Sequence, residues 1–243
     1  GLQLAKEGAN VALVARDMGA LEAAAAEISR AGGGQAKGFK ADTGDDAAVK
    51  KMVADVVSAF GRVDILINCA AAPGGQAKPP ALAEITNEAF WADMNVKVMG
   101  YLRCAREVVP GMRARGWGRI VLISGLAARQ TGNTVGSMRN IAVAAMGKNM
   151  ADELGPSGIN VNVVHPGLTR TERTAPLVAA RAQALGLPAQ EVQAQMAAGN
   201  SIQHLVDAAE VADVVAFLCS PRARAINGDV IAAGGGAPRS IHY

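Results

Sequence analysis

The chain has 243 residues, of which 50% are hydrophobic and 19% are charged, and its formal net charge is +3. This size and apolar content fit one large α/β domain with a substantial core. The small net charge, the scattered Lys and Arg residues and an aromatic content of only 3% exclude a nucleic-acid-binding surface built on basic blocks or base stacking.

The cysteines indicate a reducing compartment. Cys69, Cys104 and Cys219 are few, odd in number and set in apolar surroundings, which is typical of free thiols in a cytoplasmic protein. Their spacing offers no metal site, and we expect none. No apolar run approaches the length of a membrane span and no signal peptide is visible, so we expect a soluble protein without a membrane partner.

Strand-like and helix-like segments alternate along the chain. Helices are expected at residues 2–8, 18–30, 45–60, 86–115, from the loop after 124 to about 154, and at 207–219; strands are expected at 11–15, 35–41, 63–68, 119–123, 159–164 and 229–232. A loop containing Pro73-Gly74-Gly75 follows the third strand. This alternation predicts a single-domain α/β fold over residues 1–243, a doubly wound parallel sheet of the Rossmann-like, three-layer αβα kind.

Residues 173–203 form a helical segment rich in Ala, Gln, Leu and Met. We interpret this segment as a mobile lid over the site, which would suit a substrate with an apolar part. An ordinary amphipathic helix pair that packs on the core is the alternative.

The stretch from residue 118 to residue 171 reads as strand, helix and parallel strand. An apolar run ends in Ser124, a helix of small residues follows, and a second apolar run leads into Pro166 and Gly167. Ligands of such units bind at the carboxyl ends of the strands. Ser124 and the segment after Pro166 are therefore expected at the site.

Three motifs in this stretch resemble the short-chain dehydrogenase/reductase family. They are MADEL at 150–154, GINVN at 158–162 and PGLTRT at 166–171, where the family shows Leu-Ala-x-Glu-Leu, Gly-Ile-x-Val-Asn and Pro-Gly-x-x-x-Thr. The resemblance covers nearly the whole chain. It implies an oxidoreductase that uses a nicotinamide cofactor, and a homodimer or homotetramer built on the helices at 86–115 and around 142–151.

The chain departs from the family at its two central catalytic positions. Counting back from Glu153, the family's Tyr falls on Gly136 and its Lys falls on Asn140. Tyr101 and Tyr243 are the only tyrosines, and neither is in register. The chain therefore resembles a divergent member without the Tyr-x-x-x-Lys pair, in which Ser124, Asn95 and Asn140 would orient substrate and water.

The resemblance also implies a set of cofactor-binding residues. Arg16 after the strand at 11–15 favours NADP over NAD, although Asp17 beside it could repel the 2′-phosphate and a solvated Arg is the alternative. The other expected residues are Asp42 for the adenine amino group, with Thr43 beside it, and Thr171 for the nicotinamide carboxamide. Asn68, Ala70, Pro166 and Gly167 complete the expected cofactor-binding set.

The first strand and the Gly-rich phosphate loop of the family are not found in these residues. We expect about 20 or more residues to precede Gly1, since neighbouring strands would otherwise expose long apolar edges.

Two functions remain open from the sequence. The first is an NADP-dependent oxidoreductase with an altered proton relay that acts on a small carbonyl or alcohol substrate. The second is a non-catalytic protein of this fold that binds a dinucleotide or a small apolar ligand. A lyase or isomerase is a third, weaker reading.

Overall fold

The computed structural model describes residues 1–71 and 79–238 of the chain. The loop residues Pro73-Gly74-Gly75 and the C-terminal Tyr243 lie outside the described residues.

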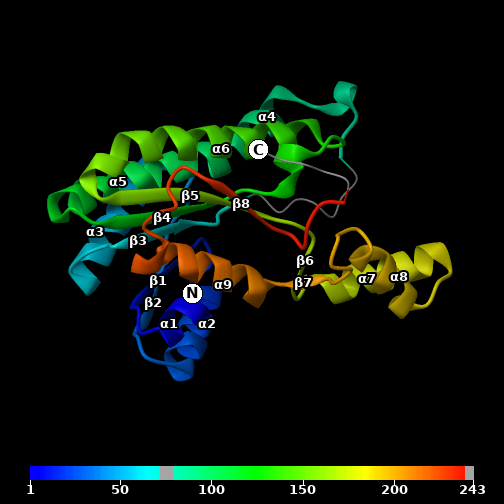
Figure 1. Ribbon diagram of the computed structural model, residues 1–243, viewed down its shortest axis with the longest axis horizontal. Coiled ribbons are helices and arrows are strands. Elements are labelled where there is room, and N and C mark those ends of the chain that lie inside the picture. The colour runs from blue at the N-terminus through cyan, green and yellow to red at the C-terminus, as the bar shows by residue number, and fades with distance from the viewer. Residues whose placement is uncertain (72–78, 239–243) are drawn as a thin grey trace.

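Parallel strands form the centre of the molecule (Figure 1). The larger sheet has the order β3-β4-β5-β8, and β1 and β2 form a separate parallel pair. The bounds are β1 (Val11–Ala15), β2 (Ala36–Lys40), β3 (Ile65–Asn68), β4 (Gly118–Ile123), β5 (Ile159–Pro166) and β8 (Val230–Ala233). Every pairing within the larger sheet is parallel, as the crossover pattern of the sequence predicts.

Helices cover both faces of the strands, which confirms the doubly wound α/β fold (Figure 1). One layer holds α3 (Asp46–Phe60), α5 (Gly100–Arg115) and α6 (Thr134–Leu154), and the other holds α1 (Leu2–Lys6), α2 (Met18–Ala31) and α9 (Ala208–Cys219). Asp17 and Asp45 cap α2 and α3 through side-chain oxygens that accept from the backbone of Ala20 and Ala48.

The GINVN motif at residues 158–162 leads into β5, a central strand of the larger sheet, and its residues have structural roles there. Its apolar residues, Ile159 and Val161, belong to the main core between the sheet and α6. Its asparagines are also buried but are satisfied: Nδ2 of Asn160 and Nδ2 of Asn162 both donate to the carbonyl oxygen of Ile226 at 2.9 Å. These bonds fasten the turn before β8 to β5, so this motif has a structural role.

The helical region before β4 is interrupted. A short 3₁₀ turn (Leu82–Glu84) precedes α4 (Asn87–Met94), and the π-helical turn η2 (Asn95–Met99) joins α4 to α5. Further 3₁₀ turns lie at Leu126–Arg129, Gly155–Ser157 and Pro221–Ala223.

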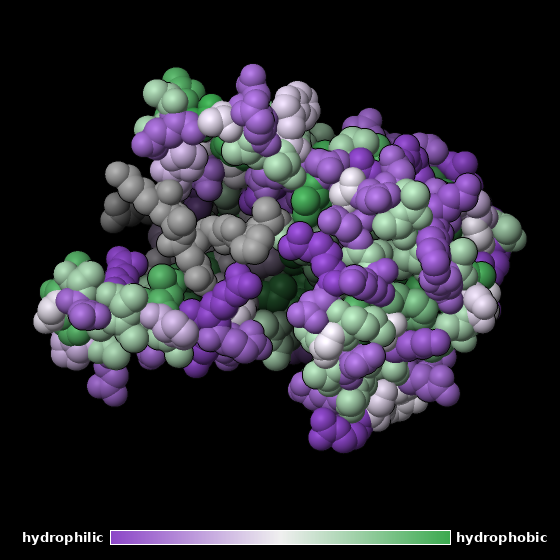
Figure 2. Space-filling model, turned by 180° about the vertical axis from the view of Figure 1, so that it is seen from behind, coloured by the Kyte–Doolittle hydropathy of each residue, from purple (hydrophilic) through white to green (hydrophobic). Residues whose placement is uncertain are grey.

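Residues expected to form a lid make a helix pair, α7 (Thr174–Leu185) and α8 (Ala189–Ala197). The pair projects from one end of the molecule as a lobe (Figures 1 and 2). Its base is the short parallel pair β6 (Thr169–Arg170) and β7 (Val206–Asp207), which the sequence did not predict. Val178, Val192 and Met196 pack together in the lobe as a small apolar cluster of their own.

No helix in the described part of the chain is both long enough and apolar enough to cross a membrane.

Candidate active site

The buried strands β4 and β5 end side by side and carry polar groups at their ends. Ser124 follows β4, and its backbone N–H donates to the carbonyl oxygen of Val164 at 2.8 Å. Its side chain is buried, and Oγ donates to the backbone carbonyl oxygen of Asn140, in α6, at 3.0 Å. Two of the expected catalytic residues, Ser124 and Asn140, are therefore in direct contact at the ligand-binding edge of the sheet.

A third polar side chain reaches this point from η2. Lys97 is only 4% exposed, and its Nζ atom donates to the carbonyl oxygen of Ser124 at 3.0 Å and to Oδ1 of Asn140 at 3.1 Å. Sequence analysis missed Lys97. A signal was present, because Lys97 precedes the buried Tyr101 and Cys104 by four and seven positions, the spacing of one helix face.

The position of Lys97 changes its proton affinity. The pKa of its ammonium is lowered from the ordinary range to about 8, mainly by burial and then by the like charge of Arg139, while Asp93 opposes this shift. Arg139 and Asp93 are themselves an ion pair, in which Nη1 donates to the two carboxylate oxygens at 2.6 and 2.8 Å. Lys97 can therefore hold or release a proton close to neutral pH.

The position at which the family has Tyr is closed in this chain. Asn133 caps α6, and its Oδ1 accepts from the backbone N–H of Gly136 at 2.8 Å. A Cβ atom at Gly136 would lie 2.8 to 3.0 Å from three atoms of the Asn133 side chain. Any larger residue would displace this cap, a loss of about 1 kcal/mol.

Tyr101 lies near Ser124 but is held in a structural role. Its hydroxyl donates to the backbone carbonyl oxygen of Ile123 at 2.9 Å, and the side chain is 1% exposed. Burial raises the pKa of Tyr101 far above its ordinary value. The phenol is therefore no substitute for the proton donor of the family.

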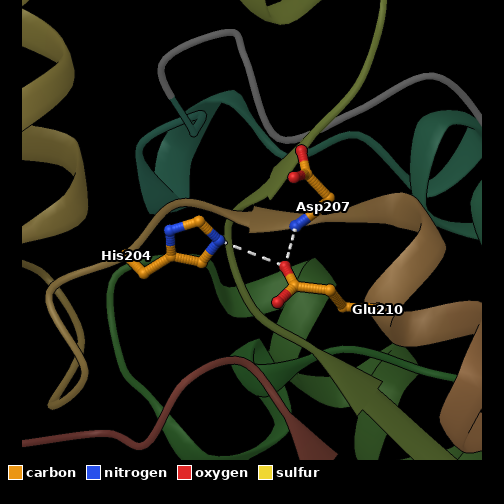
Figure 3. A group of neighbouring side chains, drawn as sticks. All are labelled: His204, Asp207 and Glu210. Atoms are coloured by element: carbon orange, nitrogen blue, oxygen red, sulfur yellow. Dashed lines mark hydrogen bonds and ion pairs between the residues drawn. The ribbon is translucent and has the colours of Figure 1, made fainter.

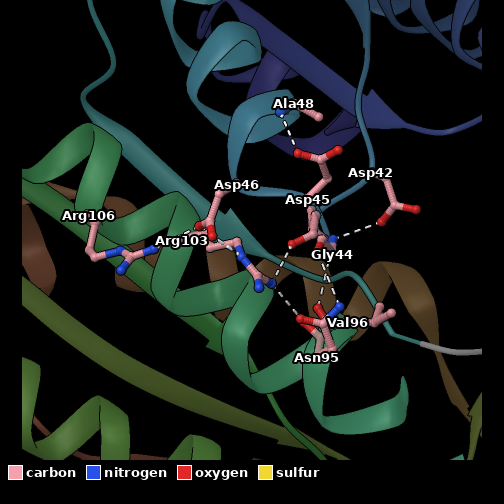
Figure 4. Close-up of polar contacts among 10 residues, drawn as sticks. Asp42, Gly44, Asp45, Asp46, Ala48, Asn95, Val96, Arg103 and Arg106 are labelled. Carbon is pink, nitrogen blue, oxygen red and sulfur yellow. Dashed lines mark hydrogen bonds and ion pairs between the residues drawn. The ribbon is translucent and has the colours of Figure 1, made fainter. Parts of the chain in front are cut away.

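Asn95, expected among the catalytic groups, faces another part of the molecule (Figure 4). Its Nδ2 donates to the carbonyl oxygen of Gly44 at 3.2 Å, and the adjacent Val96 carbonyl accepts from Oγ1 of Thr43 at 3.4 Å. Lys97, two residues further along η2, bonds Ser124 and Asn140 instead, so Asn95 and Lys97 point in different directions. The structure thus places Asn95 against the turn after β2 and not at the end of β4.

The expected adenosine-binding residues lie after β1 and β2. Arg16 is exposed, and no ion pair links it to another residue in the described ranges. The carboxylate of Asp17 turns to α2, where Oδ1 accepts from the backbone N–H of Ala20 at 3.1 Å. Oδ1 of Asp42 accepts from the backbone N–H of Gly44 at 2.8 Å, which leaves its other oxygen free of hydrogen bonds within the described residues.

Asn68 and Ala70 lie at the carboxyl end of β3, at the same edge of the sheet as Ser124. Asn68 is buried, and its Nδ2 donates to the carbonyl oxygen of Tyr101 at 3.3 Å, so it ties β3 to α5. Ala70 is half-buried and small, which lets a ligand approach the backbone there.

The segment after β5 leads into the lobe. Pro166 ends β5, and a Cβ atom at Gly167 would lie 2.8 Å from Cα of Gly234, so these two backbones are in contact. The Thr171 backbone N–H donates to Oγ1 of Thr174 at 2.9 Å. Thr171 also borders a cavity of about 380 Å³ between β6 and the lobe, whose polar lining includes Arg170, Gln190, Gln193, Gln203 and His204.

His165 supports the site from beneath. It is 1% exposed, and its Nδ1 accepts from the backbone N–H of Gly125 at 3.2 Å. Burial, with the positive charges of Arg129 and Lys97, lowers the pKa of His165 to about 4. The imidazole is therefore neutral near pH 7 and holds the residue after Ser124 in place.

One group of side chains could suggest a metal centre. Ligand atoms of His204, Asp207 and Glu210 lie within 4.8 Å of one another (Figure 3). However, Oε2 of Glu210 accepts from the backbone N–H of Asp207 at 2.7 Å and lies 3.2 Å from Nε2 of His204. Asp207 also pairs with Arg170 at 2.9 Å. These are the contacts of a capped helix, and we assign no metal to them.

The motifs and the fold agree with the comparisons with known proteins. A family model described as enoyl-(acyl carrier protein) reductase matches residues 2–238. The short-chain reductase protein NovJ of Streptomyces niveus is 32% identical over 237 residues, which cover 97% of this chain and 87% of NovJ. The chain belongs to the short-chain dehydrogenase/reductase family. Its resemblance to that family is thereby confirmed.

Solved structures of this short-chain dehydrogenase/reductase fold match closely. L-Sorbose reductase from Gluconobacter frateurii, complexed with NADPH and L-sorbose, is 28% identical with a TM-score of 0.90, covering 99% of this chain and 91% of that one. An NAD⁺-bound xylitol dehydrogenase is 27% identical with a TM-score of 0.85, covering 97% and 92%. Both are oxidoreductases with a nicotinamide cofactor, one with each form.

Proposed function

We propose that this protein is an NADP-dependent oxidoreductase that interconverts a carbonyl group and an alcohol on a small molecule, with a proton relay that differs from the family's. The observation that carries the proposal is the buried cluster of Ser124, Lys97 and Asn140 at the carboxyl ends of the strands. A buried ammonium is costly to the fold, and a perturbed ionisable group at a ligand-binding edge is a candidate for chemistry. Bound NADPH would supply the hydride for the substrate carbon.

The residues at both ends of the site fit a dinucleotide. The free oxygen of Asp42 can accept from an adenine amino group, and Thr171, which follows β6, offers a hydroxyl for the nicotinamide carboxamide. Lys97 supplies positive charge near the place where the family's Lys would stand. The chain's own residues would thus hold the adenine and nicotinamide ends of the cofactor.

Arg16 supports NADP over NAD. Its exposed guanidinium is available for a 2′-phosphate, and the neighbouring Asp17 carboxylate is turned to the N-terminus of α2. The NADPH complex of L-sorbose reductase agrees with this preference, and the NAD⁺ complex of xylitol dehydrogenase shows that related proteins also use the other cofactor.

The test is separate titration of the full-length protein with NADPH and NADH, followed by fluorescence. We expect micromolar binding of NADPH and weaker binding of NADH. Arg16→Ala should weaken NADPH binding about 10- to 100-fold, the loss of a charge-assisted bond, and leave NADH unchanged. Arg30→Ala, which changes an exposed Arg near the end of α2, is the control. Failure of both nucleotides to bind would overturn the proposal.

The closed position at Gly136 favours the second candidate, a non-catalytic protein that binds a dinucleotide or a small apolar ligand. It predicts NADPH binding without turnover over a broad panel of ketones and aldehydes. Measurable NADPH oxidation with any of them would exclude it.

The structure offers less support for an apolar part of the substrate than for a carbonyl group on it. Val178, Val192 and Met196 are used for packing within the lobe, and polar side chains border the cavity beside Thr171. A lid role for residues 173–203, a homodimer or homotetramer and a cytoplasmic location remain predictions.

A further inference from the structure

Building on the proposed function, we propose that Lys97 is the proton donor of carbonyl reduction, in place of the tyrosine that this chain lacks. Its Nζ atom hydrogen-bonds both Ser124 and Asn140, and no other cationic side chain of the described residues does so. Two of its three N–H bonds have acceptors, and the third has none within the described ranges. We assign that N–H to the substrate oxygen.

The neutral side chain of Asn140 suits the buried ammonium of Lys97. At the family's Lys position, Asn140 presents a neutral oxygen 3.1 Å from Nζ of Lys97. A lysine in its place would set a second ammonium against the first, in a buried region where like charges repel strongly. The loss of Lys at this position and the presence of Lys97 on the facing turn η2 are therefore two parts of one rearrangement.

Three other polar groups near Ser124 have partners of their own. The Tyr101 hydroxyl donates to a backbone carbonyl, Nδ1 of His165 accepts from a backbone N–H, and Arg139 is paired with Asp93. The ammonium of Lys97 is the acid whose hydrogen bonds reach both Ser124 and Asn140.

The charges around Lys97 set the pH at which it can act. The titratable and charged groups that influence it are Arg139 on α6, Asp93 on α4, Cys69 after β3 and His165 on β5. In reduction, hydride adds to the carbonyl carbon while a proton leaves Nζ for the carbonyl oxygen. The products are the alcohol, the oxidised cofactor and a neutral amine, which regains a proton from water. In alcohol oxidation the neutral amine accepts the proton.

The opposite proton requirements give a sharp test. With a substrate identified from the carbonyl panel, wild-type reduction should be constant below pH 8 and fall as the pH rises through about 8, because the acid form is lost. Alcohol oxidation should rise through the same pH. Lys97→Met should lower kcat at saturating NADPH about 100-fold or more, the usual contribution of a general acid. Lys97→Arg should be slow and show no break near pH 8, since its guanidinium does not deprotonate.

Two further measurements separate this role from a structural one. The ¹⁵N NMR signal of the Lys97 ammonium, assigned by its loss in Lys97→Met, should titrate near pH 8 without any cofactor present. Lys148→Met, an exposed Lys on α6, is the control and should keep wild-type kcat and pH profile.

The outcomes distinguish the two proposals. Wild-type turnover that survives in Lys97→Met, or a pH break that persists in Lys97→Arg, would overturn the assignment of Lys97 and leave the oxidoreductase function standing. No wild-type turnover with any carbonyl would overturn the proposed function, and the donor assignment with it.

Discussion

His165 shows how one buried imidazole can couple the shape of the site to pH. Its Nδ1 must be unprotonated to accept from Gly125, and burial lowers its folded-state pKa to about 4 from an ordinary value near 6.5. A base whose pKa is lowered by folding adds stability above its unfolded pKa. This stability should be lost as the pH falls from 6.5 toward 4.

We therefore predict that His165→Asn flattens the acid side of the stability profile. The Asn oxygen can accept from Gly125 but does not titrate. Between pH 6.5 and pH 4.5 the wild type should lose on the order of 2 kcal/mol more unfolding free energy than the variant, as one pKa unit is about 1.4 kcal/mol. Urea unfolding at both pH values measures the difference, with exposed His204→Asn as control. Equal losses in wild type and His165→Asn would contradict the prediction.

Individual residues also mark the limit of what the sequence could reveal at the site. The motifs located Ser124 and Asn140, and the structure brings them together. Lys97 was missed because a charged residue in a helix is ordinarily solvated. Only the buried face formed by Tyr101 and Cys104 indicates otherwise, and that face continues through a π turn.

The π turn η2 interrupts the long helix, and its side chains contact two different parts of the molecule. One face sends Lys97 to the end of β4. The other holds the turn after β2, where Asn95 bonds Gly44 and the buried Arg103 donates to the carbonyl oxygens of Thr43 and Asn95 at 3.1 and 3.2 Å (Figure 4). The turn that carries Asp42 and the proposed proton donor are therefore attached to the same helical segment.

This arrangement predicts that Asn95→Ala affects cofactor binding more than chemistry. Loss of the bond to Gly44 should loosen the turn that carries Asp42. The NADPH Kd should rise about 3- to 10-fold, the range of one neutral hydrogen bond, while kcat at saturating NADPH stays within about twofold. Asn149→Ala, an exposed helical Asn on α6, should change neither value. A large fall in kcat with an unchanged Kd would instead place Asn95 in the proton relay.

Helices and strands with strong periodic patterns were predictable almost to the residue. The strand at Val11–Ala15 and the helix end at Leu154 agree with the sequence analysis. The π turn was not predictable, because it depends on how α4 and α5 pack and not on local propensity. The two-residue strands β6 and β7 carry too short a pattern to be recognised.

At the scale of the whole molecule, the alternation of strands and helices predicted the sheet and its two helical layers. It did not predict how the lobe packs. Its Met- and Ala-rich composition was read as a cover for an apolar substrate. In the structure, Val178, Val192 and Met196 pack together in an apolar cluster inside the lobe. Composition alone does not tell whether an apolar helix faces a ligand or its neighbour, because both surfaces have the same residue types.

Apolar side chains remain exposed on the outer layer of helices, where the family resemblance predicts an interface. Trp91 on α4 is 65% exposed, and Met138 and Ile141, one helical turn apart on α6, are 49% and 52% exposed. The Arg139–Asp93 ion pair joins these two helices directly beside the apolar residues. Exposed apolar groups gathered on adjacent helices are typical of a protein–protein contact.

We predict that this surface joins two copies of the chain. Ile141→Glu would bury two carboxylates at a symmetric contact, which costs several kcal/mol, and should lower the mass measured by light scattering to that of a single chain. Val57→Glu, at a comparably exposed apolar position on α3, should leave the mass unchanged. A wild-type protein that is already monomeric at micromolar concentration, or an Ile141→Glu variant of unchanged mass, would show that α4 and α6 face solvent.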